Sequence, residues 1–153
     1  MTATAFARVD YAPAPTPYQL IGGEAGAREL TGAFFDALDG YPGLAPLRAI
    51  HPADLSQMRD QLGRWMSQWL GGPPAWSGAR GETPCILTIY ADVAIDAAQA
   101  RLWMAGMRRA FEHADLSAEL VDLIDPPLAL VCEGLRKDYG ADLALLQDNE
   151  PGI

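Results

Sequence analysis

Side chains that could do chemistry are few in this sequence, and they form no familiar catalytic or metal-binding pattern. The two histidines, His51 and His113, are far apart along the chain, and neither is close to Cys85 or Cys132. There is no phosphate-binding loop, no nucleophile motif and no cluster of His, Cys and acidic residues with metal-ligand spacing. We therefore assign no catalytic residues. We also expect both cysteines to remain reduced thiols, because neither belongs to a CxxC pair.

The elements that must position any site are predicted to be helices. Leu30, Phe34 and Leu38 recur every four residues, which places them on one face of a helix that ends near residue 40. A second helix is expected to start after Asp54, a plausible cap. It is expected to end at the Gly-Gly-Pro-Pro run of residues 71–74, because glycine terminates helices and proline cannot continue them.

Two further helices are predicted in the second half of the chain, one starting near Asp96 and one near Ser117. Pro126 and Pro127 should interrupt or restart the last helix, since a proline in a helix interior costs ~3 kcal/mol. Residues 85–90 are rich in β-branched and aromatic types, which favour a strand. A single short strand would have no partner, so we expect an irregular or weakly helical stretch buried against the core.

Length and composition fit one globular domain. The 153 residues are half apolar and one-fifth charged. We expect a flexible leader over residues 1–16, a folded domain over 17–146 and a flexible tail over 147–153. The net charge of -9 makes nucleic acid and anionic membranes poor partners. No secretory signal and no membrane-spanning run is visible, so a cytoplasmic protein is expected.

Four short segments carry a resemblance to a known family: YQLIGG at 18–23, LRAIHPADL at 47–55, WLGGP at 69–73 and WMAGM at 103–107. Their order and spacing resemble those of the group II truncated haemoglobins, from about Tyr18 to Lys137. The resemblance implies an all-α truncated globin fold, a two-over-two helical sandwich around a haem. Glycine suits the very short links of such a fold, because it adopts left-handed dihedral angles without penalty.

The residue that should hold the haem iron is different here. In the family a histidine about thirteen residues before the pocket tryptophan binds the iron, and counting back from Trp103 reaches Tyr90. A count forward from the preceding glycine pair reaches Ile89 unless one residue is inserted. Neither His51 nor His113 can be shifted to this position. Tyr90 is therefore either a tyrosinate ligand of haem iron, as in catalases, or a core or rim aromatic in a protein without haem.

The ligand side of the implied pocket is also altered. Phe35 stands where the family usually carries a tyrosine that stabilises bound oxygen, and phenylalanine offers no donor. Met58 and Leu62 are expected to line the pocket. Trp103 keeps an indole N–H that could reach a ligand, and His51 lies at the edge of the same side, where a surface role is equally open.

Two functions follow from these residues. By resemblance, the chain is a haem protein that binds oxygen or another diatomic ligand. However, the stretch 86–93 lacks the basic residue that helps to hold a haem propionate, and it contains Asp92. The alternative is a haem-free globin fold that binds a protein partner or a small apolar ligand, the ligand in a cavity lined by Phe35, Met58, Leu62 and Trp103. By analogy with the family, a homodimer could form through apolar residues after position 127.

Overall fold

The described part of the chain is built from helices joined by short turns. A computed structural model describes residues 14–73 and 85–138, and no strand occurs in these two stretches. In chain order the elements are α2 (Pro17–Ile21), α3 (Gly23–Gly40), the 3-10 turn η1 (Pro42–Leu44), α4 (Ala45–Ala49), α5 (Ser56–Trp69), α6 (Ile86–Ile89), α7 (Ala97–His113) and α8 (Ala118–Gly134). The all-α class predicted from the periodicity is confirmed.

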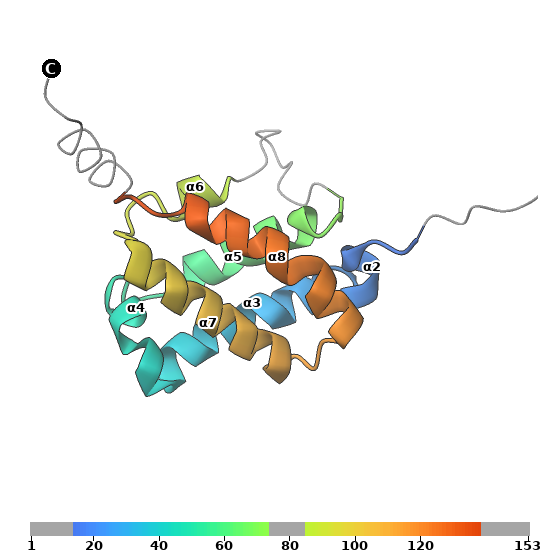
Figure 1. Cartoon of the computed structure of the whole chain (residues 1–153), viewed down its shortest axis with the longest axis horizontal. Helices are drawn as coiled ribbons and strands as arrows, with labels where there is room; N and C mark the ends of the chain where they lie inside the picture. The colour runs from blue at the N-terminus through green and yellow to red at the C-terminus, as the bar shows by residue number, and fades with distance from the viewer. Residues whose placement is uncertain (1–13, 74–84, 139–153) are drawn as a thin grey trace, which may run out of the picture.

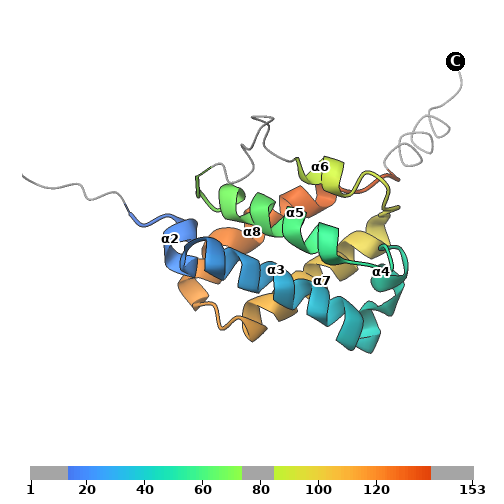
Figure 2. The same ribbon diagram turned by 180° about the vertical axis from the view of Figure 1, so that it is seen from behind.

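The four longest helices form two layers. In Figure 1, α7 and α8 lie in front of α3 and α5, and Figure 2 shows the opposite order from behind. Helix α3 packs against both α5 and α7, and α7 packs against α8. This arrangement is the expected two-over-two helical sandwich. The short helix α6 lies beside α5, and α4 connects the end of α3 to α5, so both short helices border the same end of α5 and α7.

Side-chain caps set the start of three long helices close to where the sequence predicted them. The Asp96 carboxylate accepts a hydrogen bond from a backbone N–H in the first turn of α7 at 2.8 Å. Ser117 does the same for α8 at 3.2 Å. The Asp54 carboxylate accepts from the N–H of Ser56 at 2.9 Å, so this aspartate caps the first residue of α5 from two positions away. Each cap satisfies an N–H that has no partner inside its helix.

The expectation that Pro126 and Pro127 interrupt the last helix is wrong. Helix α8 continues through both prolines to Gly134. Each proline removes one donor, so the carbonyl groups of Asp122 and Leu123 lose their helical partners. Both of these residues are exposed, which lets water satisfy the carbonyl oxygens. The opposite face of α8 stays packed in the core through Leu120, Ile124, Leu128 and Cys132, and this burial holds the helix together.

Two glycines redirect the chain where the resemblance predicted short links. Gly22 joins α2 to α3 with a φ of 97°, and Gly71 follows α5 with a φ of 109°. Both values lie in the left-handed region, which costs a residue with a Cβ roughly 1–2 kcal/mol. The backbone N–H of Tyr18 also donates to the Leu70 carbonyl at 2.9 Å. The two links therefore tie the start of the domain to the end of α5.

Residues 85–90 behave as expected. They form one turn of helix, α6, with Ile86 and Tyr90 buried. Cys85 is exposed, Cys132 is buried, and both are free thiols. Of the predicted leader and tail, only residues 14–16 are described, so the domain boundaries remain predictions. None of the helices seen in the described stretches is long and apolar enough to cross a bilayer.

Candidate functional site

The structure brings four of the six predicted pocket residues into direct ring contact. His51 follows α4, Phe35 comes from α3, Tyr90 follows α6, and Trp103 comes from α7. The ring centroids of Phe35 and His51 are 6.2 Å apart, those of His51 and Tyr90 5.4 Å, and those of Tyr90 and Trp103 6.4 Å, all edge to face. We call these four residues the Tyr90 cluster. It ties α3, α7 and the two short helices together.

A directed chain of hydrogen bonds runs through the cluster. The indole N–H of Trp103 donates to the Tyr90 hydroxyl at 3.0 Å. His51 Nδ1 lies 2.8 Å from the Leu47 carbonyl oxygen, which can only accept, so Nδ1 carries the proton. In the neutral ring Nε2 is then an acceptor, and the Tyr90 hydroxyl donates to it at 3.2 Å. Every donor in the chain from Trp103 to Leu47 therefore has an acceptor.

Burial keeps both titratable members of the cluster neutral. Desolvation lowers the pKa of His51, and the nearby positive charge of Arg48 lowers it further, although the hydrogen bond to Leu47 opposes both. Desolvation raises the pKa of Tyr90 well above the ordinary value for a phenol. The Lys137 ammonium lies close by, but it donates to the backbone carbonyls of Tyr90 and Ala91 and not to the phenol. The side chain at position 90 is thus a phenol and not a phenolate.

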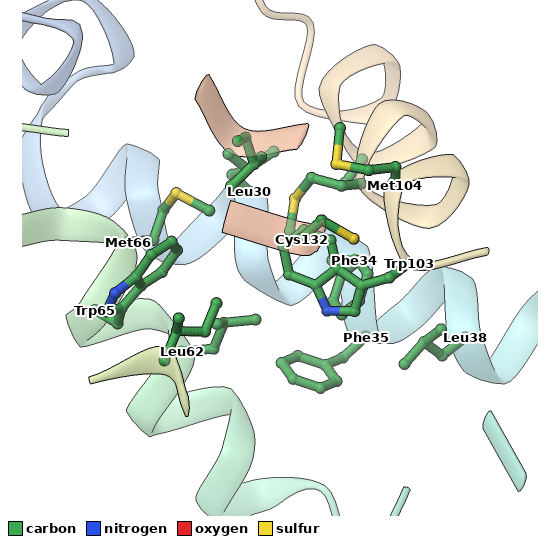
Figure 3. Close-up of a cluster of buried hydrophobic side chains, with 14 of the residues drawn as sticks. Leu30, Phe34, Phe35, Leu38, Leu62, Trp65, Met66, Trp103, Met104 and Cys132 are labelled. Atoms are coloured by element: carbon green, nitrogen blue, oxygen red, sulfur yellow. The ribbon is translucent and has the colours of Figure 1, made fainter. Parts of the chain in front are cut away.

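Protein side chains fill the space inside the cluster. Phe35, Leu62 and Trp103 have no accessible surface, and Met58 is 5% exposed. A void large enough for water would appear as accessible surface on the residues around it. Figure 3 shows Trp103 in the middle of this packing, with Phe34 and Phe35 on one side and Leu62 toward α5. The expected cavity lined by Phe35, Met58, Leu62 and Trp103 is therefore wrong, because all four belong to one buried core cluster that leaves them almost no accessible surface.

An open cleft lies outside the cluster, between α5 on one side and α6 with the loop after it on the other. Its volume is about 430 Å³, within the usual range for small-molecule sites. We call it the α5–α6 cleft. His51 is the one cluster residue that reaches it. Its apolar lining is Ile50, Pro52, Met58, Ile89 and Val93, and its polar lining is His51, Gln57, Gln61, Thr88 and Asp92.

The electrostatics of the α5–α6 cleft are one-sided. Asp92 carries the only full charge among its lining residues. Within the part of the chain that the structure describes, the side chains of Gln57, Gln61, Thr88 and Asp92 make no hydrogen bond or ion pair with other residues. The cleft therefore offers free amide and hydroxyl groups and one carboxylate to a ligand, and it offers no cation to an anionic one.

The residues present do not fit a haem held in the manner of the truncated haemoglobins. A flat porphyrin needs the atoms that touch its two faces to be about 7 Å apart, since van der Waals contact takes ~3.5 Å on each side. The Tyr90 hydroxyl, at the expected iron-binding position, instead lies 3.0 Å from Trp103 and 3.2 Å from His51, which the resemblance places on the ligand side. The α5–α6 cleft also lacks a cation for a propionate.

The sequence did not indicate which residues would contact the candidate site residues. The contact between His51 and Tyr90 joins residues 39 positions apart, and no local pattern signals it. Nothing in the sequence indicated that the Leu47 carbonyl would accept a hydrogen bond from His51. Gln57 and Gln61 stand one turn apart on the outer face of α5, a spacing that could have marked them once the facing helix was known. Elsewhere in the described residues, no group of three His, Cys, Asp or Glu side chains could hold a metal ion.

The fold and the segment order agree with comparisons to known proteins. The model of the bacterial-like globin family matches residues 16–130. The chain is 28% identical over 126 residues to the group 2 truncated hemoglobin YjbI of Bacillus subtilis (strain 168), an alignment that covers 82% of this chain and 92% of that protein.

Comparison with solved structures indicates the same family. The chain is similar to the group II 2-on-2 hemoglobin of Agrobacterium tumefaciens, with 31% identity, a TM-score of 0.73 and coverage of 83% of this chain and 98% of the other. It is also similar to the truncated oxygen-avid haemoglobin of Bacillus subtilis, with 26% identity, a TM-score of 0.67 and coverage of 80% and 100%. The chain therefore belongs to the bacterial-like globin family, as a globin similar to the group II truncated haemoglobins.

Proposed function

We propose that this globin works without haem iron bound at position 90, and that it binds a small molecule in the α5–α6 cleft. One observation carries the proposal: the Tyr90 hydroxyl is hydrogen-bonded to both Trp103 and His51, so no porphyrin can lie between them. Opening this space would break both bonds and expose rings that now have almost no accessible surface. In this proposal the Tyr90 cluster takes the place of the cofactor in the core.

The lining of the α5–α6 cleft indicates the kind of ligand. Apolar side chains such as Met58 and Ile89 can bury a hydrocarbon surface. The amides of Gln57 and Gln61 and the carboxylate of Asp92 can orient polar groups on it. Because the only full charge is negative, a neutral or cationic molecule is favoured and a carboxylate is not. This ligand replaces the purely apolar one expected from the sequence, whose cavity is filled.

A titration with haemin tests the proposal. We expect the unchanged protein to give only the broad absorbance of free haemin at a 1:1 ratio. Tyr90→His places an imidazole at the family's iron-binding position and removes the phenol from Trp103, so a sharp Soret band should appear for that variant. Tyr41→His, which adds an imidazole at a half-exposed position, is the matched control and should give no band. A stoichiometric Soret band from the unchanged protein would overturn the proposal.

A haem-dependent function is the second candidate, and one observation favours it: Tyr90 stands thirteen residues before Trp103, the spacing of the family's ligand. In that case tyrosinate would hold the iron, and oxygen or another diatomic molecule would be the ligand. The phenol would first have to leave two hydrogen bonds and ionise against its raised pKa. Its signature is a tyrosinate charge-transfer band that Tyr90→Phe abolishes. A haem spectrum unchanged by that substitution would assign the iron to another group.

Two finer expectations also belong to the proposal. A cytoplasmic location agrees with the free thiols of Cys85 and Cys132, since reduced cysteines are usual there. A homodimer agrees with exposed apolar residues on the outer face of α8, where Leu130 is 75% exposed and Leu123 49%. Fractionation of cells tests the first, and sedimentation of Leu130→Lys against the unchanged protein tests the second.

A further inference from the structure

We propose that Tyr90 and His51 form a one-electron donor site, at which a small neutral radical oxidant held in the α5–α6 cleft takes an electron from the Tyr90 phenol while the phenolic proton moves to His51 Nε2. The inference deepens the proposed function and rests on it, since His51 lines the proposed ligand site and contacts Tyr90. It depends on the geometry of the Tyr90 cluster and the α5–α6 cleft, and it requires that position 90 carries no iron.

The hydrogen-bond chain supplies what phenol oxidation requires. A phenol that loses an electron becomes a very strong acid, so its oxidation is easy only when a base stands ready to take the proton. His51 Nε2 is such a base, because it accepts the Tyr90 hydrogen bond at 3.2 Å while Nδ1 donates to Leu47. The pair is buried, with Tyr90 1% and His51 7% exposed, so water competes little for the proton. This is the arrangement of a positioned general base.

The direction of the same chain makes Tyr90, and not Trp103, the residue that gives up the electron. Trp103 is an oxidisable aromatic in contact with Tyr90, but its N–H points at the Tyr90 oxygen, which already carries a hydrogen. Trp103 therefore has no free base for its proton. After oxidation the Tyr90 oxygen keeps the indole N–H as a donor, which holds the radical oxygen in place. An oxidising equivalent that reached either ring would settle on Tyr90.

The α5–α6 cleft gives the oxidant access and selects its charge. His51 lines the cleft, and Ile89, which precedes Tyr90 in the chain, lines it as well. The Asp92 carboxylate and the net charge of -9 disfavour anionic oxidants, so neutral radicals are admitted. We assign the oxidant to the class of organic peroxyl radicals.

The atoms and charges of the step balance. The O–H bond of Tyr90 breaks and an N–H bond forms at His51 Nε2. The electron passes to the peroxyl radical, which takes one proton from water in the cleft and becomes a hydroperoxide. The products of this step are the neutral Tyr90 radical, protonated His51, the hydroperoxide and the hydroxide ion left by that water. Burial and the charge of Arg48 both oppose a lasting positive charge on His51. His51, which lines the cleft, therefore returns its extra proton to the hydroxide, and the net products are the Tyr90 radical and the hydroperoxide.

The test uses the purified, haem-free full-length chain. Peroxyl radicals from a neutral, thermally decomposing azo initiator are the probe, and freeze-quenched electron paramagnetic resonance is the readout. We expect one neutral tyrosyl radical signal in the unchanged protein. Tyr90→Phe should lower it at least tenfold, and Tyr41→Phe, the matched control, should leave it unchanged. A signal that persists in Tyr90→Phe, or a tryptophanyl signal in its place, would overturn the proposal.

A second variant isolates the base. In His51→Gln the amide oxygen can still accept a hydrogen bond from the phenol but cannot take its proton. Radical formation should therefore slow by roughly a hundredfold, the size of a general-base contribution. The unchanged protein should also react more slowly in D₂O, a measurement that needs no variant to fold. Equal rates in water and D₂O, or in His51→Gln and the unchanged chain, would refute the role of His51. Uptake of haemin would overturn the proposed function and leave this test, made without haem, unaffected.

Discussion

Replacing Tyr90 by phenylalanine should destabilise this protein through a single oxygen atom. The substitution keeps the ring and its packing, and it removes the hydroxyl that accepts from Trp103 and donates to His51. Trp103 has no accessible surface, so its N–H would stay buried without an acceptor. Such an orphaned donor costs about 1–3 kcal/mol. His51 borders the α5–α6 cleft, and water there can replace the lost donor for less than about 1 kcal/mol.

The expected loss in the free energy of unfolding is therefore about 1–4 kcal/mol. With a urea m-value of ~2 kcal/mol/M, the midpoint of urea unfolding should fall by about 0.5–2 M without a change in slope. Tyr41→Phe is the control. Tyr41 is 41% exposed, and no hydrogen bond of its hydroxyl is seen among the described residues, so its loss should stay within ~0.5 kcal/mol.

One result would refute the reasoning. If Tyr90→Phe unfolded within ~0.5 kcal/mol of the unchanged protein at the same slope, then the hydroxyl would not be the acceptor that satisfies Trp103. Tryptophan fluorescence gives an independent check, because the loss of the indole hydrogen bond should shift the emission of the buried ring. Trp65 and Trp69, which stack on each other in α5, supply a background common to both variants.

Three further predictions concern pH and backbone. Because burial depresses the pKa of His51, the unfolded chain takes up a proton that the folded chain refuses. The free energy of unfolding should therefore fall as pH drops through about 6.5. Urea titrations at several pH values should show that this free energy depends less on pH in His51→Gln than in the unchanged protein, and an equal dependence in both would contradict the assignment. Gly22→Ala should lower the free energy of unfolding by about 1–2 kcal/mol, because its φ is positive. A Cβ added at Gly40 also meets open space, but Gly40 has no positive φ, so Gly40→Ala should not lower this free energy. Equal losses of stability in thermal melts of the two variants would contradict this. Pro126→Ala should restore a donor inside α8 and raise the free energy of unfolding by about 1–2 kcal/mol, so a fall in thermal stability would show that the proline is accommodated without cost.

The helices and their ends were predictable because they depend on neighbours in sequence. The spacing of Leu30, Phe34 and Leu38 defines a buried face, and the capping groups of Asp96 and Ser117 lie within three residues of the N–H groups they bind. Gly22 is required by a local dihedral angle. Of these residues, Gly22 also belongs to one of the four segments that carried the family resemblance.

The prediction failed where tertiary packing opposed a local rule. Pro126 and Pro127 are strong helix breakers by themselves, yet the burial of one face of α8 on α7 offsets two missing hydrogen bonds. The expected cavity failed for a related reason. Whether Phe35 and Trp103 surround a space or fill it depends on how closely α3 and α7 approach, and residue types do not encode that distance.

The sequence alone determined the all-α class and the resemblance to truncated globins, because helix periodicity, glycine links and residue identity are local properties. That Tyr90 stands at the position of the iron ligand remains a prediction. Only the tertiary structure decided what that tyrosine does. Its hydroxyl meets an imidazole 39 residues away and an indole 13 residues away. Those partners come from separate parts of the fold, the turn after α4 and helix α7, whose approach is set by the packing of the whole core and not by any spacing in the chain.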